Sequence, residues 1–161
     1  ELQEAVTGYA TRAGEKLRGQ RQLCQVLQVF IRSSPFDQRG EPYSRAVCVP
    51  LPYPSADTRD IVAAALGGLQ AIYRPGPAYA KAGVILMDFV EPGRYTPDLF
   101  APTPRPGSDQ LMAVVDAIHA RQGSGTIRPA RLAADQGFSM KRERLSPRFT
   151  TSWSELLQVK C

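Results

Sequence analysis

Five prolines crowd into a short stretch of this chain and restrict how it can fold. They lie within residues 91–107, at Pro92, Pro97, Pro102, Pro104 and Pro106. Proline lacks a backbone N–H and has a fixed φ, so this stretch can be neither a regular helix nor a central strand. The pattern predicts a proline-rich linker between two parts, residues 1–90 and residues 108–161.

Residues 1–90 alternate between helix and strand patterns. Apolar residues recur at helical spacing over residues 1–18 and again over 57–72, where Asp57 is a good N-cap. Residues 23–32, 45–49 and 79–89 are rich in β-branched and aromatic side chains, which indicates strands. This order predicts an α+β fold, with two helices on one face of a mixed sheet and the other face free.

Residues 108–161 are expected to form a small, basic, mainly helical or irregular domain. Ser108 can cap a helix that ends near Gly123. Residues 121–148 hold seven Lys or Arg against two acids, an excess of five that equals the net charge of +5 of the whole chain. Such a concentration favours an anionic partner. Three apolar residues are expected to fold back onto the helix as a small core: Trp153, Leu156 and Leu157.

Composition and spacing argue against several classes of protein. Hydrophobic residues make up 43% and charged residues 22%, which predicts a packed core. Three widely separated cysteines and one histidine support neither a disulfide framework nor a zinc site, and favour the reducing cytoplasm. No apolar run is long enough to span a bilayer. The chain begins with Glu, which indicates a fragment. The sequence contains no nucleophile–base cluster that would predict an enzyme.

The free face of the predicted sheet is a candidate surface for a DNA backbone. Such a surface needs short polar or basic side chains at alternating positions, together with backbone N–H groups that can reach phosphates. The alternative is that these are ordinary solvated positions of a sheet. The candidates lie on all three strands, with Gly83 chosen because a missing side chain allows a close approach: Gln28, Arg32, Ser33, Ser34, Arg45, Lys81 and Gly83.

Six segments, taken together, resemble one known family. They are TRAGEKLR, FIRSSPF, TRDIVAAA, YAKAGVILMDF, PRPGSDQLMAVVDAIHARQGSGT and MKRERLSPRFTTSWSELL. Their order and spacing are similar to those of the UmuC family, the catalytic subunits of DNA polymerase V, including plasmid-borne and mobile-element relatives. The resemblance covers nearly the whole chain.

The resemblance implies a function in error-prone translesion synthesis during the SOS response to DNA damage. Residues 1–90 are similar to the little-finger domain, which holds primer-template DNA. Residues 108–161 are similar to the UmuC-type C-terminal domain, which implies contacts with a processed UmuD-type dimer and the RecA filament. The palm, fingers and thumb, with their Mg²⁺-binding carboxylates, are absent, so no catalysis or cofactor is expected here. The alternative is a generic basic RNA- or ribosome-binding domain, which would need aromatic residues on its sheet.

Two docking segments also follow from the resemblance. The linker segment Thr96, Pro97, Asp98, Leu99 and Phe100 is similar to the peptide that binds the sliding clamp, although Thr96 and Pro97 depart from its Gln-Leu start, which predicts weaker affinity. Packing of this segment onto a neighbouring domain is the alternative. The tail interleaves cations with apolar residues, which suits partner docking or else a solvated basic loop: Lys141, Arg142, Arg144, Leu145, Arg148 and Phe149.

Overall fold

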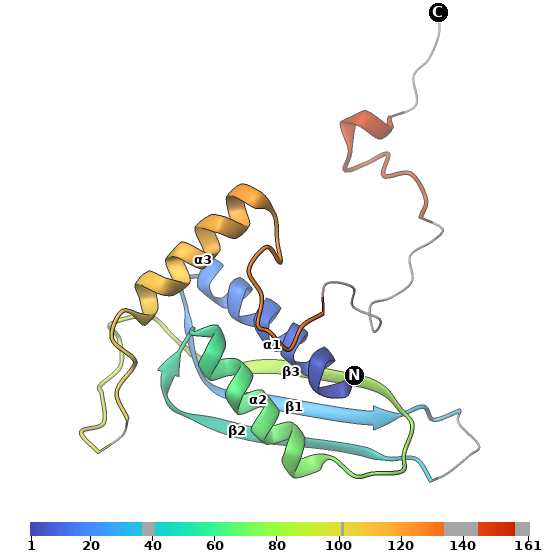
Figure 1. The fold of residues 1–161 in the computed structure, drawn as a ribbon, viewed down its shortest axis with the longest axis horizontal. Helices are drawn as coiled ribbons and strands as arrows, with labels where there is room; N and C mark the ends of the chain where they lie inside the picture. Colours follow the sequence, from blue (N-terminus) through green and yellow to red (C-terminus); the bar gives the residue numbers. More distant parts are fainter. Residues whose placement is uncertain (37–40, 101, 134–144, 157–161) are drawn as a thin grey trace, which may run out of the picture.

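The computed structural model describes residues 1–36, 41–100, 102–133 and 145–156. Its elements are α1 (Leu2–Gly19), β1 (Leu23–Ser33), β2 (Ser44–Ser55), α2 (Thr58–Ile72), β3 (Tyr79–Val90), α3 (Ser108–Gln122) and a short 3-10 turn, η1 (Trp153–Glu155). Figure 1 shows α1 and α2 covering one face of the sheet, with α3 lying next to α1. The predicted α+β class is confirmed.

The sheet has three strands in the order β2-β1-β3, and both neighbouring pairs are antiparallel. The mixed sheet that we expected is therefore not present among the described strands. The helix α2 does connect two strands, β2 and β3, that run in the same direction. They are not neighbours, because β1 lies between them and pairs with both.

Strand β2 is longer than the sequence indicated. The expected strand stopped at residue 49 because of the prolines that follow, but β2 continues to Ser55 through Pro50, Pro52 and Pro54. It lies at an edge of the described sheet, where a missing N–H does not interrupt a ladder with a further strand. The pairing of β2 with β1 shifts register between Cys24 and Val26, so the extra residues are accommodated by an irregularity.

The core lies between the helices and the sheet. Leu27, Val29 and Ile31 of β1 are fully buried and pack with residues of both helices. Alternate residues of a strand point to opposite faces, so these three define the helix-covered face of the sheet. The core residues contributed by the two helices continue the predicted helical stripes: Val6, Ala10, Leu17, Ile61, Ala65, Leu69 and Ile72.

One glycine allows α2 to approach the sheet closely. A Cβ built on Gly68 would lie 2.9 Å from Val49 Cγ2 and 3.2 Å from Val29 Cγ2. Contacts under 3.0 Å are too short for real carbon atoms, so a larger residue would push the helix off the strands. A Cβ placed in the same way on the preceding Gly67 would have no atom within 4 Å. The two adjacent glycines thus differ in what they tolerate.

The tail departs from the expected small core. Trp153 is 91% exposed and Leu156 is 42% exposed, so neither packs on α3. Leu157, the third member of that expected core, lies outside the described residues. Instead, the described tail is held by local bonds, in which the Arg148 N–H and Nε donate to the two Glu155 carboxylate oxygens at 2.6 and 3.2 Å. Among the helices described, none has the length and apolar character to cross a membrane.

Candidate nucleic-acid interface

The sheet has a face that the helices do not cover. On β1 its residues alternate with the buried Leu27, Val29 and Ile31. Cross-strand partners share a face, so the register of β2 and β3 gives the rest. We call this set the open face: Val26, Gln28, Phe30, Arg32, Ser44, Ala46, Cys48, Pro50, Lys81, Gly83, Ile85 and Met87. None of these positions carries a carboxylate.

Two cations lie side by side at one end of the open face. Arg32 and Lys81 are direct cross-strand partners, and both are exposed. Like charges directly opposite each other in a sheet repel, so this pair is unfavourable unless an anion lies between or above them. Ser44 lies on the other side of Arg32 and adds a small hydroxyl. This end of the face is suited to bind an anionic group.

Gly83 has a different neighbour from the one expected. A Cβ placed on it would lie 2.4 Å from Cζ of Phe30, its cross-strand partner, so the ring of Phe30 occupies the space over the glycine. The sequence led us to expect a backbone to approach at this position. The group that approaches is a side chain of the same sheet, and the structure gives no separate reason for an external backbone to come close there.

Gln28 lies at the middle of the open face, whereas three other predicted residues lie off it. Gln28 Nε2 is 3.5 Å from Cys48 Sγ, its cross-strand partner. Ser33 Oγ accepts a hydrogen bond from Tyr43 N at 2.9 Å, and Ser34 Oγ accepts one from Phe36 N at 3.2 Å. Both serines therefore bond backbone N–H groups beyond the end of β1 and do not lie on the open face.

Arg45 lies on the helix side of the sheet. Its register partner is Ile31, which is buried under the helices, and its guanidinium carbon is 5.9 Å from the Tyr43 ring centroid. Arg45 was a candidate because of its charge, and its side of the sheet depends on a register that the sequence does not reveal. The structure brings together Gln28, Arg32, Lys81 and Gly83, and leaves Ser33, Ser34 and Arg45 apart.

The apolar half of the open face was not among the residues predicted from the sequence. Ile85 is exposed, and Val26, Pro50 and Met87 extend the apolar half from it. The signal was available, because Lys81, Gly83, Ile85 and Met87 share one parity along β3. The apolar end of the face lies toward the end of β3, where the linker begins, and the basic end lies at the opposite end of the strands.

All five residues of the predicted clamp segment are exposed. Thr96, Pro97 and Asp98 help to line a cavity of about 420 Å³ beside β1 and β2. Leu99 and Phe100 are 94% and 96% exposed, and the Phe100 N–H donates to Asp98 Oδ1 at 2.9 Å. The two apolar side chains thus do not pack on the described residues before or after them.

The predicted partner-docking residues of the tail are only partly described. Leu145 is 70% exposed, Phe149 is 43% exposed, and Arg148 pairs with Glu155. The other three predicted residues, Lys141, Arg142 and Arg144, lie outside the described residues. The described part therefore presents two apolar side chains and one cation that is already paired.

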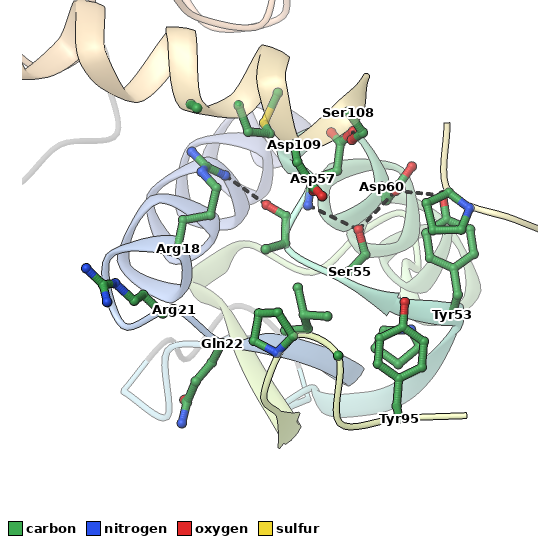
Figure 2. Close-up of a pocket in the computed structure, with 18 of the residues that line it drawn as sticks. Arg18, Arg21, Gln22, Tyr53, Ser55, Asp57, Asp60, Tyr95, Ser108 and Asp109 are labelled. Atoms are coloured by element: carbon green, nitrogen blue, oxygen red, sulfur yellow. Dashed lines mark hydrogen bonds between the residues drawn. The ribbon is translucent and has the colours of Figure 1, made fainter. Parts of the chain in front are cut away.

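A cavity of about 520 Å³ lies where the end of α1, the end of β2 and the start of α3 meet (Figure 2). Asp60 accepts hydrogen bonds from Tyr53 Oη and Ser55 Oγ at 2.9 and 3.0 Å. Burial and the hydrogen bond to Asp60 raise the pKa of Tyr53. Throughout the described ranges, no group of three or more His, Cys, Asp or Glu could hold a metal ion.

Asp57, which also lines this cavity, is the N-cap of α2, as the sequence predicted. Its carboxylate accepts a hydrogen bond from Arg59 N at 2.7 Å and another from Ser108 Oγ. Burial alone would raise its pKa, but the bonds from Arg59 and Ser108 outweigh burial and lower the pKa to about 2. A carboxylate held ionised by its neighbours in this way serves the helix end and not proton transfer.

Comparison with known families identifies the chain. The model of the "impB/mucB/samB family C-terminal domain" matches residues 1–99, which is more than half of the sequence. The chain belongs to this family. A second model, for a domain of unknown function called DUF4113, matches residues 109–159. The UmuC-family membership expected from the six segments is confirmed.

Individual relatives agree with this assignment. The chain is 45% identical to Protein UmuC of Salmonella typhimurium strain LT2 over 161 residues, covering 99% of this chain and 38% of that protein. It is 44% identical to Protein MucB of Escherichia coli over 157 residues, covering 97% of this chain and 37% of that protein. The chain thus spans less than two-fifths of the length of these relatives. No solved structure matches it.

Proposed function

We propose that the open face grips primer-template DNA through its sugar-phosphate backbone, as the little-finger-like part of a UmuC-type translesion polymerase. The observation that carries this proposal is the exposed Arg32–Lys81 pair on a face without carboxylates. Family membership favours DNA as the anion. The parent protein would supply polymerase chemistry with Mg²⁺, and the chain would act in the bacterial cytoplasm at the nucleoid during the SOS response.

The chemistry of the open face favours a backbone grip over base recognition. Cations and short polar groups neutralise phosphates, whereas the apolar positions such as Val26 and Ile85 suit contact with deoxyribose. Such binding has little sequence preference and weakens steeply with salt. The RNA-binding alternative needs aromatic rings free for stacking, but the ring of Phe30 is held over Gly83.

The open face carries a built-in probe, because Cys48 is exposed on it. We expect saturating primer-template DNA to slow alkylation of Cys48 by N-ethylmaleimide at least about fivefold at low salt, and roughly 0.5 M salt to abolish this protection. Peptide mass spectrometry measures each thiol separately. Cys24 is buried, and burial raises its pKa to about 11, so it stays unmodified with or without DNA.

Three outcomes of this experiment count against the proposal. If DNA binds, as followed by fluorescence anisotropy, while Cys48 reacts at its free rate, the DNA lies elsewhere on the chain. Equal protection of Cys161, which lies outside the described residues, would indicate a general effect of DNA on the reagent. Stronger protection by single-stranded RNA than by duplex DNA would favour the RNA-binding alternative.

A second docking function is proposed for the linker segment Thr96–Phe100, with the sliding clamp as partner. The supporting observation is that Leu99 and Phe100 project almost completely into solvent. Apolar side chains of this kind are the usual anchors of a docked peptide. The three residues before them border a cavity beside β1 and β2 and are themselves exposed, so the whole segment is accessible to a partner.

Replacing Leu99 and Phe100 together by alanine is expected to weaken capture by immobilised sliding clamp about tenfold, because both anchors are removed. DNA affinity should remain within about twofold of the unmodified chain, since neither residue belongs to the open face. The matched control replaces two exposed apolar residues of the tail, Leu145 and Phe149, by alanine. Equal capture of all three proteins would rule out the segment as the clamp peptide.

The tail is proposed to dock the processed UmuD-type dimer and the RecA filament. Its support is the basic excess of residues 121–148 together with the exposed Leu145 and Phe149. A surface that combines charge with apolar side chains suits a specific protein contact, because charge guides the encounter and apolar burial stabilises the complex.

A further inference from the structure

An arginine of α1 connects three elements at the shoulder of the molecule. Arg18 Nε and Nη2 donate to the two carboxylate oxygens of Asp116 on α3, both at 2.7 Å. Its remaining nitrogen, Nη1, donates to Ala56 O and Thr58 Oγ1 at the start of α2, both at 2.9 Å. The Arg18 side chain is only 11% exposed, whereas that of Asp116 is 37% exposed, so the arginine end of this planar, two-point ion pair is largely removed from water.

Further contacts join residues 105–133 to the start of α2 and to α1. Asp57 Oδ2 accepts a hydrogen bond from Ser108 Oγ at the start of α3. Arg105 Nη2 lies 3.3 Å from Asp60 Oδ1. Beyond α3, the chain runs back beside α1 toward its N-terminal end (Figure 1). There Arg131 Nη1 donates to Gln3 Oε1 at 2.8 Å, and Ala133 N donates to Glu4 Oε1 at 3.0 Å.

Apolar burial and a histidine contact accompany these polar bonds. Met112 of α3 and Leu132 after it are buried. His119 Nε2 lies 2.8 Å from Ile127 O, and its buried Nδ1 lies 3.2 Å from Glu15 Oε1 of α1. The segment 105–133 therefore contacts α1 and the start of α2 through ion pairs, hydrogen bonds and buried side chains.

We propose that the α1–α2 shoulder is a docking surface whose partner is this chain's own segment 105–133, which we call the clasp. The clasp and the described part of residues 1–100 then form one cooperative unit. Both ends of the proline-rich linker are then fixed on the same body, one at β3 and the other at Ser108. The linker is a closed loop that displays Leu99 and Phe100, and it is not a hinge between two domains. This proposal does not depend on DNA binding.

The ion pair between Arg18 and Asp116 is the contact at which the clasp can be tested. Removing the charge of Asp116 leaves the largely buried Arg18 guanidinium without compensation, which costs more than the pair contributes as a whole. Asp116→Asn keeps the shape of the side chain and removes its charge. The carboxylate of Glu155 pairs with an arginine in the tail, away from the clasp, so Glu155→Gln is a matched control.

The experiment is hydrogen exchange of the full chain, read by mass spectrometry. In the unmodified chain we expect α3 amides to be protected to within about tenfold of those of α1, because the two open together. In Asp116→Asn we expect α3 amides to exchange at least about tenfold faster, with α2 changed by less than about twofold. Glu155→Gln should leave α3 unchanged.

The two residues should also act through each other. The double variant Arg18→Gln with Asp116→Asn should expose α3 no more than the worse of the two single variants, since one interaction is lost only once. Additive effects would overturn the pairing. Unchanged α3 exchange in Asp116→Asn, or α3 exchanging as fast as the linker in the unmodified chain, would overturn the clasp.

Discussion

Replacing Arg32 and Lys81 together by glutamine is expected to lower the affinity for primer-template DNA about a hundredfold at 0.1 M salt. Each phosphate contact releases about 0.9 counterion, which is worth roughly tenfold in affinity at that salt concentration. The slope of log affinity against log salt should therefore become shallower by about 2. Fluorescence anisotropy of a labelled primer-template, titrated at several salt concentrations, measures both quantities.

The control removes the same charge from the opposite side of the sheet. Arg12 and Lys16 are exposed on α1, in the helix layer, so Arg12→Gln with Lys16→Gln should change affinity less than about threefold. An equal loss in both double variants would mean that net charge, and not the open face, determines binding. Arg45→Gln should also have a small effect, because the register places Arg45 on the helix side.

Replacing Gly68 by leucine is expected to lower the free energy of unfolding by about 3 kcal/mol. The new side chain would start within 2.9 Å of Val49 Cγ2 and must displace α2 from β1 and β2. Valine side chains of a packed sheet cannot swing aside, because they have few allowed rotamers. Urea denaturation followed by circular dichroism measures this loss.

The adjacent glycine provides the control for this substitution. Gly67 also lies within α2, but nothing surrounds the position of its missing Cβ. Gly67→Leu should leave stability unchanged or raise it by up to about 1 kcal/mol, because leucine favours helix far more than glycine does. Equal destabilisation by both variants would show that α2 does not rely on a close approach at Gly68.

Local patterns predicted the elements because each pattern is a property of a few neighbouring residues. The helical stripe that begins after the Asp57 cap and the apolar run around Leu27, Val29 and Ile31 gave α2 and β1 nearly as observed. The order of elements gave the α+β class, and six segments gave the family. The proline content also predicted an irregular linker, although it wrongly ended the second strand early.

Contacts between distant residues could not be predicted in the same way. Nothing near Gly83 indicates that Phe30 covers it, and nothing near Arg18 points to Asp116, which lies 98 positions later in the chain. The side of the sheet on which Arg45 lies depends on its pairing with β1. A shift of one residue in that pairing would reverse it.

The sequence by itself therefore determined which residues share a face of one element, and with them the fold class, the family and a basic candidate surface. Only the tertiary structure decided which faces meet. It joined Arg32 to Lys81, turned Arg45 to the other side and docked α3 on α1 across the linker. The physical reason is that periodicity is encoded locally, whereas register and docking depend on packing among all the elements at once.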